Sequence, residues 1–206
     1  MQQHSFRQQL HLLYELTRAS IKVQHEGSAL GVLWYLLGPL LTFAILLLVF
    51  SQRLGADVPS YPLYLFLGII TWNLFGTGSS VAMRSLSLNG GLLKALPVPK
   101  YLLVIAAVCA VLFSHMIELM IYLAASLFLG VVPAHILFFL LVLVLQCVFI
   151  IGVGLALAPL YLFFRDLEQI WTFVLRIGWF ATPIFYALRP YGPGETISQA
   201  NPLYHM

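Results

Sequence analysis

Long runs of apolar residues constrain this chain more than any other feature. An α-helix needs about 20 predominantly apolar residues to cross the roughly 30 Å of hydrocarbon in a bilayer. We count five such runs, at about residues 30–50, 61–83, 101–129, 135–163 and 169–188. Only 8% of the residues are charged, whereas about a quarter are charged in a soluble domain. The sequence therefore predicts an all-α fold, a polytopic membrane helix bundle of five spans that forms a single domain over residues 1–206.

Basic residues outside these runs predict the orientation of the bundle. Lys and Arg concentrate on the cytoplasmic side of membrane spans. The N-terminal segment and the loops 84–100 and 164–168 share one side, which carries seven basic residues: Arg7, Arg18, Lys22, Arg84, Lys94, Lys100 and Arg165. The other side carries only Arg53 and Arg189. We therefore expect a cytoplasmic N-terminus and a cytoplasmic 84–100 loop, with residues 189–206 on the outward side.

The first 29 residues lack the continuous apolar core and the small-residue cleavage site of a signal peptide. Within SFRQQLHLLYELTRASIKVQ, helical spacing places five side chains on one stripe: Phe6, Leu10, Leu13, Thr17 and Ile21. Three basic residues lie off that stripe: Arg7, Arg18 and Lys22. This pattern favours an amphipathic helix at the cytoplasmic interface, lying on the inner leaflet. An ordinary polar segment before the first span is the alternative.

Few ionisable side chains lie inside the predicted spans. Glu118, with His115 one turn before it, lies about 18 residues or ~27 Å beyond the start of the third span, toward the outer half. Arg176 lies about 8 residues or ~12 Å above the 164–168 loop. These depths argue against a direct ion pair. We expect Arg176 to extend toward the cytoplasm. For His115 and Glu118, an interhelical hydrogen bond and a polar point facing a conduit both remain open.

Aromatic residues make up 14% of the chain, and several lie too deep for the membrane interfaces. Sugar rings stack their C–H faces on aromatic rings, so an aromatic-lined conduit would suit a sugar polymer. Candidate conduit residues are Trp72, Phe75, Glu118, Tyr122 and Trp179. For each aromatic residue taken alone, core packing is the alternative.

The chain has no recognisable catalytic, metal-binding or nucleotide-binding motif. H-E-x-x-H and G-x-S-x-G are absent from the sequence. Asp166 and Glu168 are two residues apart, so on a helix they face different ways, and we interpret them as a cytoplasmic turn before the fifth span. NGGLLK lacks the spacing and the preceding strand of a phosphate-binding loop. We therefore expect no cofactor in this chain and an external source of energy for any transport.

The polar segment NGGLLKALPVPK, residues 89–100, separates the second and third runs. A short cytoplasmic helix held by Pro97 and Pro99 could be gripped by a soluble motor. In a helix starting near Ser85, an apolar stripe forms that excludes Lys94. Its members are Leu88, Leu92 and Leu96. The alternative is a plain connection between two spans.

Six segments of the chain occur in the order found in one transporter family. They are EGSALGVLWYLLGPLL (26–41), YPLYLFLGIITWNLF (61–75), NGGLLKALPVPKYLL (89–103), YLFFRDLEQIWTFVL (161–175), TPIFY (182–186) and NPLYH (201–205). Over essentially its whole length the chain resembles the type-2 ABC-transporter permeases. Within them it is most similar to the bacterial exporters of O-antigen, capsule and teichoic acid.

The resemblance implies a transporter subunit without enzymatic activity of its own. A homodimer of permeases would pair with two ATPase subunits, which bind ATP and Mg, and no nucleic acid would be involved. Lipid-linked glycan would cross the bacterial inner membrane through a conduit between the permeases. The ATPase would dock on residues 5–25 and 84–100, which gives the candidate docking residues Arg7, Arg18, Lys22, Asn89, Leu92, Lys94 and Leu96.

The chain departs from the family pattern at its end. Family members have a sixth span after the NPL motif, whereas this sequence stops at Met206, so we expect a shortened chain. Three other functions remain open. An ABC exporter of drugs or small lipids fits the same features. A glycan polymerase or acyltransferase would need more converging polar residues, and an ion-coupled carrier would need midplane charges and an inverted repeat.

Overall fold

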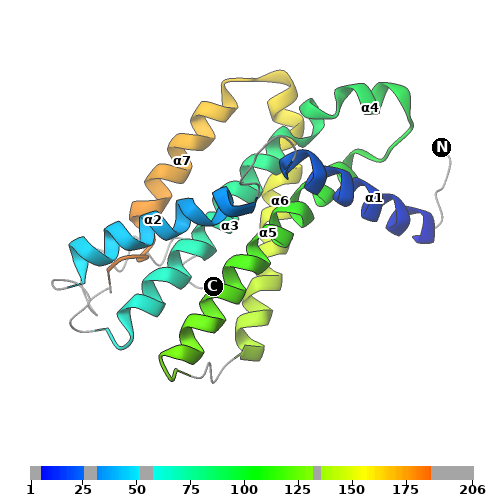
Figure 1. Cartoon of the computed structure of the whole chain (residues 1–206). Helices are drawn as coiled ribbons and strands as arrows, with labels where there is room; N and C mark the ends of the chain where they lie inside the picture. Colours follow the sequence, from blue (N-terminus) through cyan, green and yellow to red (C-terminus); the bar gives the residue numbers. More distant parts are fainter. Residues whose placement is uncertain (1–5, 26–31, 52–57, 132–135, 187–206) are drawn as a thin grey trace.

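The computed structural model describes residues 6–25, 32–51, 58–131 and 136–186. Within these ranges the chain forms seven helices and no strand, which confirms the predicted all-α class (Figure 1). The helices are α1 (Phe6–His25), α2 (Val32–Phe50), α3 (Tyr61–Leu88), α4 (Gly90–Ala95), α5 (Lys100–Phe128), α6 (Ile136–Phe163) and α7 (Leu167–Ala181).

Three helices in the described part of the chain are long and apolar enough to cross a membrane. They are α3 over Tyr61–Leu88, α5 over Lys100–Phe128 and α6 over Phe138–Phe163. The apolar helix Leu36–Phe50 within α2 is shorter, and α7 has 15 residues. Three of the five predicted spans therefore have the necessary length, and the membrane-crossing role of α2 and α7 stays a prediction.

The core of the bundle forms where α5 and α6 pack against α3. Leu65, Ile70 and Leu74 of α3 are 0 to 1% exposed, as is Ile150 of α6. Small residues allow this close approach: a Cβ added at Gly78 would lie 3.0 Å from Ile150 Cγ2. Helices in lipid associate through such van der Waals packing, because lipid tails are as apolar as leucine.

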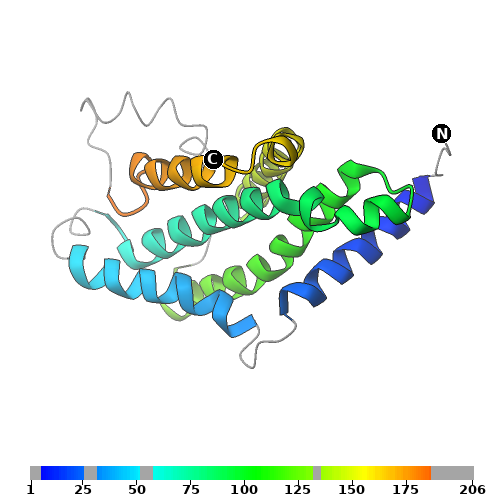
Figure 2. The same ribbon diagram turned by 90° about the horizontal axis from the view of Figure 1, so that it is seen from above.

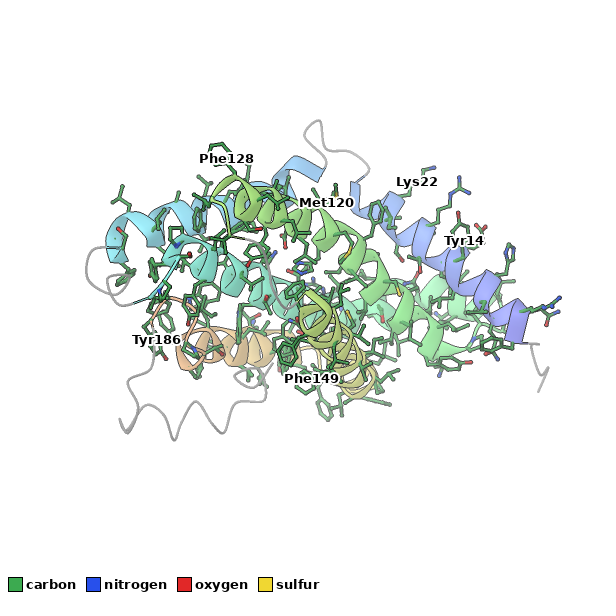
Figure 3. All side chains as sticks on the ribbon, turned by 90° about the horizontal axis from the view of Figure 1, so that it is seen from below. Tyr14, Lys22, Met120, Phe128, Phe149 and Tyr186 are labelled. Carbon is green, nitrogen blue, oxygen red and sulfur yellow. The ribbon has the colours of Figure 1, made fainter. Side chains whose placement is uncertain are left out.

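The outside of the bundle is apolar as well. Met120 of α5 is 68% exposed and Phe128 is 92% exposed, and both point outward in Figure 3. Exposed apolar surface of this kind marks contact with a membrane or a partner when it is extensive. The exterior therefore fits a lipid environment around α5.

The remaining helices lie around this core. α1 packs against α5, and its Leu16 contacts the core cluster. α1 and α4 lie at the same end of the bundle in both views, and we call it the α4 end (Figures 1 and 2). α7 runs along α3 (Figure 2). At the far end the Tyr61 hydroxyl donates a hydrogen bond of 2.9 Å to the Phe185 carbonyl, which ties the segment after α7 to the start of α3.

Candidate functional site

The α4 end gathers the segments that the sequence predicts as a docking surface. α3 stops at Leu88, and the Asn89 side chain donates a 2.8 Å hydrogen bond from Nδ2 to the Ser85 carbonyl. The Leu93 amide then donates to the Asn89 carbonyl at 3.0 Å, within the six-residue helix α4. Asn89 is therefore the joint between the two helices.

One detail of the predicted docking segment is wrong. The sequence analysis expected a continuous helix from Ser85 with Leu88, Leu92 and Leu96 on one stripe. The helix instead breaks at Asn89, before two glycines that have little helical preference. Leu88 and Leu96 remain 75% and 53% exposed, whereas Leu92 packs against the chain's own core together with Leu93. Leu92 thus contributes to the packing of this chain itself.

A helix occupies the predicted range at the N-terminus. Arg7, Arg18 and Lys22 are exposed on α1. Phe6 and Leu10, on the stripe expected to face the inner leaflet, are also exposed. The position of α1 on a membrane surface stays a prediction.

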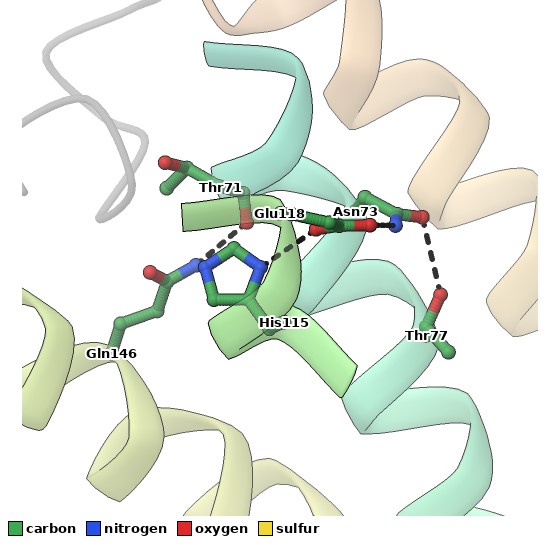
Figure 4. A network of polar contacts seen from close by, with 6 residues as sticks. All are labelled: Thr71, Asn73, Thr77, His115, Glu118 and Gln146. Carbon is green, nitrogen blue, oxygen red and sulfur yellow. Dashed lines mark hydrogen bonds and ion pairs between the residues drawn. The ribbon is translucent and has the colours of Figure 1, made fainter. Parts of the chain in front are cut away.

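A polar network lies inside the bundle (Figure 4). Asn73 of α3 donates from Nδ2 to Glu118 Oε1 of α5 at 2.9 Å. His115 Nδ1 lies 2.8 Å from Glu118 Oε2, and Thr77 donates to Asn73 Oδ1 at 3.3 Å. Glu118 is 1% exposed and His115 is 3% exposed.

This geometry favours one of the two interpretations of Glu118. Its carboxyl group has partners on its own helix and on α3, and hydrogen bonds of this kind hold helices together in lipid. A second interhelical bond joins Gln146 Nε2 of α6 to the Thr71 carbonyl of α3 at 2.8 Å. The network therefore acts as a clasp between α3, α5 and α6, and Glu118 faces the interior of this chain.

Three of the predicted conduit residues come together between α3 and α7. The ring centroids of Trp72 and Trp179 are 6.1 Å apart, and those of Trp72 and Phe75 are 5.7 Å apart. Phe75 is buried at 7% exposure, while both tryptophans are half-buried. Tyr122 lies on α5 and packs against the core cluster. The structure thus groups the three residues of α3 and α7 and places Tyr122 elsewhere.

An ion pair links α3 to α7 at the α4 end, and sequence reasoning missed it. Arg84 Nη1 lies 2.7 Å from Glu168 Oε1, and the Tyr161 hydroxyl of α6 donates to Glu168 Oε2 at 2.8 Å. The hydrogen bond from Arg84 lowers the pKa of Glu168, and the bond from Tyr161 adds to the effect. Arg84 follows the second predicted span and Glu168 precedes the fifth, both on the side expected to be cytoplasmic. These opposite charges could have predicted the ion pair from the sequence.

Comparison with known proteins decides the family. The family described as ABC-2 type transporter matches residues 11–206. The chain belongs to this family. The resemblance inferred from its motifs is thereby confirmed, and this ABC-2 chain is a membrane permease subunit.

Among known relatives, this ABC-2 chain is similar to O-antigen export permeases. It is 29% identical over 178 residues to the O-antigen export system permease protein RfbA of Myxococcus xanthus, covering 86% of this chain and 68% of that protein. It is 26% identical over 178 residues to the protein of the same name from Klebsiella pneumoniae, covering 85% of this chain and 69% of the relative.

Proposed function

We propose that the chain is the permease subunit of an ABC exporter that moves a lipid-linked polysaccharide from the cytoplasmic to the outer side of the bacterial inner membrane. The observation that carries this proposal is the family match over residues 11–206, with relatives named as O-antigen export permeases. A separate ATPase subunit would bind ATP and Mg and supply the free energy. Two permease chains would enclose the conduit.

The proposed topology has five spans and a cytoplasmic N-terminus. α3, α5 and α6 have the length to cross the bilayer, and we assign the fourth and fifth spans to α2 and α7. The excess of basic residues in the N-terminal segment and the 84–100 and 164–168 loops supports a cytoplasmic α4 end. The aromatic pair Trp72 and Trp179, half-buried between α3 and α7, is the best-placed part of the proposed conduit.

The ATPase would dock at the α4 end. The helix α1, whose basic residues are exposed, lies at the same end of the bundle as α4 (Figure 1). Leu88 and Leu96, before and after α4, are exposed and apolar. Because Leu92 packs on the chain's own core, the exposed Leu96 is the better anchor for a groove on the partner. Anchors of this kind are apolar side chains that lose most of their water contact on binding.

Paired substitutions at Leu96 and Lys94 test this docking. Leu96→Asp should cost roughly 2 kcal/mol or more of binding free energy, or about a thirtyfold loss of affinity. Lys94→Ala removes a rim charge and should cost less than about 1 kcal/mol. The measurement is co-purification of the ATPase with each variant at matched membrane levels. Undiminished recovery of the ATPase with Leu96→Asp would rule this docking surface out.

The proposed division of labour between the permease and a separate ATPase can be tested with purified proteins. Because the sequence has no nucleotide-binding motif, the purified permease alone should neither bind nor hydrolyse ATP, and the ATPase subunit should restore both. Stoichiometric ATP binding by the pure permease would contradict the proposed function.

A further inference from the structure

Two rows of polar side chains meet at the Arg84–Glu168 ion pair and take no part in the proposed docking. The row on α3 has spacings of three and four residues, and the row on α7 has spacings of four. Residues at these spacings share one face of a helix. We call the two rows together the polar flank: Thr77, Ser80 and Arg84 on α3, with Glu168, Thr172 and Arg176 on α7.

Helical spacing turns the outer part of both rows away from the Trp171–Ser79 side of the contact between α3 and α7. Arg84 and Glu168 join them at the α4 end over 2.7 Å. On the other side, Trp171 Nε1 of α7 donates to Ser79 Oγ of α3 at 3.0 Å. Trp171 lies roughly 140° around α7 from Arg176, at 3.6 residues per turn. α3 runs between α7 and α2 in Figure 2.

The aromatic packing on α6 identifies the side from which the flank faces away. The rings of Phe75 on α3 and Phe149 on α6 stack with centroids 5.7 Å apart, and Phe75 also contacts Trp171. α6 therefore covers the Trp171 side of the contact. The polar flank is left open on the opposite side, where Thr172 and Arg176 are exposed.

The polar flank carries one cation without an anionic partner in the described part of the chain. Arg84 is neutralised by Glu168, whereas the contact that the structure gives Arg176 is with the Phe173 ring, 5.9 Å from its centroid. A charge inside the membrane costs free energy unless it meets an opposite charge or water. Arg176 is about 9 residues or ~13 Å from the start of α7. Phe173 is one turn nearer the α4 end, so the guanidinium leans toward the headgroup level of that leaflet.

Most of the remaining exposed surface of α7 is apolar, with Gln169 near its start as a polar exception. Ile170, Val174 and Ile177 are exposed and apolar, which suits contact with lipid tails. On α7, the exposed hydroxyl group of Thr172 and the cation of Arg176 both lie on the polar flank. A guanidinium binds phosphate through two parallel hydrogen bonds. The hydroxyl protons of Thr77 and Thr172 are already donated within the chain, so their oxygens are left to accept hydrogen bonds from sugar hydroxyls.

We propose that the polar flank binds the phosphate that joins lipid to glycan in the exported substrate, with Arg176 as its cation. The threonine hydroxyls contact the first sugar, and the apolar side of α7 lies along the lipid chain. This inference rests on the proposed function and names the part of the substrate that the flank recognises. It also gives Arg176 a role in substrate binding, beyond the extension toward the cytoplasm expected from the sequence.

The test is binding of a radiolabelled polyprenyl pyrophosphate to the full chain in phosphatidylcholine nanodiscs. Arg176→Gln removes the charge and should weaken binding about tenfold or more, as expected for lost hydrogen bonds to a charged group. Arg176→Lys keeps the charge without the planar fork and should retain part of the affinity. Arg165→Gln is the matched control: it removes an exposed arginine just before α7 and should leave affinity within about twofold. Size-exclusion profiles and thermal midpoints establish that each variant is folded.

The role of Arg176 depends on how the variants and a competing lipid change binding of the probe. Equal binding by wild type and Arg176→Gln overturns the inference, because Arg176 then only extends toward lipid headgroups. A second arm uses phosphatidylglycerol as competitor. If it displaces the probe as effectively as unlabelled polyprenyl pyrophosphate, the flank is a general headgroup site and the substrate assignment is overturned. If wild type itself does not bind the probe, the proposed function fails, which is a different outcome from unchanged binding by the variant.

Discussion

Gly154 of α6 provides a sharp test of how closely the bundle is packed. A Cβ atom at this position would lie 2.5 Å from Ala82 Cβ of α3 and 3.1 Å from Val104 Cγ1 of α5. Carbon atoms pack at about 3.5–4.0 Å, so Gly154→Ala forces the helices apart by about 1 Å. Overpacking of this kind costs typically ~1–3 kcal/mol. We therefore expect Gly154→Ala to destabilise the contact between α6 and the other two helices.

Gly152, two residues earlier on α6, is the matched control because a Cβ there would meet nothing within 4 Å. Both substitutions change helix propensity in the same way. The difference between their melting temperatures therefore reports the packing contribution alone. At about 2–4 °C per kcal/mol, Gly154→Ala should melt roughly 2–12 °C below Gly152→Ala. A thiol-reactive dye can follow unfolding in detergent through the half-buried Cys109 and Cys147. Equal melting temperatures would refute the close packing of α6 on α3.

Three further predictions concern topology, the buried clasp and the ion pair. Cysteine at Ser87 should be labelled only from the cytoplasm and cysteine at Ser60 only from outside; the reverse would overturn the orientation. Glu118→Leu leaves buried polar partners unsatisfied and should lower stability by about 1–3 kcal/mol in thermal unfolding, so an unchanged midpoint would contradict the clasp. Because Arg84 lowers the pKa of Glu168 from 4.5, the stabilisation is present above pH 4.5 and lost as pH falls through the lowered value. The difference in midpoint between wild type and Glu168→Gln should vanish there, and its persistence would contradict the link.

The helix bounds follow from the sequence in part. The run 61–83 stops five residues before α3 ends at Leu88. The runs 101–129 and 135–163 correspond to α5 and α6 within one residue at each end. The run 169–188 overshoots, because α7 ends at Ala181. Thr182 precedes Pro183, and its backbone is extended at φ −94° and ψ 131°. A residue before proline disfavours the helical conformation. The prediction relied on apolar composition, which continues beyond Thr182, and so placed the end of the helix too late.

The contacts between helices could not be predicted in the same way. Glu118 was recognisable as an unusual residue, but its partner Asn73 lies 45 positions away on another helix. Packing along the whole length of two helices decides which of their faces meet. A span that is apolar on all sides has little sequence pattern that would identify the contacting face. The same limit applied to Leu92, whose inward direction follows from the break at Asn89.

The polar partners of the later helices share one location, and this bears on how the chain is made. Each of α5, α6 and α7 places a polar side chain against α3: Glu118 on Asn73, Gln146 on the Thr71 carbonyl, Trp171 on Ser79 and Glu168 on Arg84. Synthesis runs from the N-terminus, and α3 precedes all three helices in the chain. Whenever a later helix leaves the ribosome, the residue that satisfies its polar group has already been translated. The polar groups of α5, α6 and α7 therefore never wait for a partner that has still to be translated, whereas Asn73 and Arg84 of α3 wait until the later helices are made.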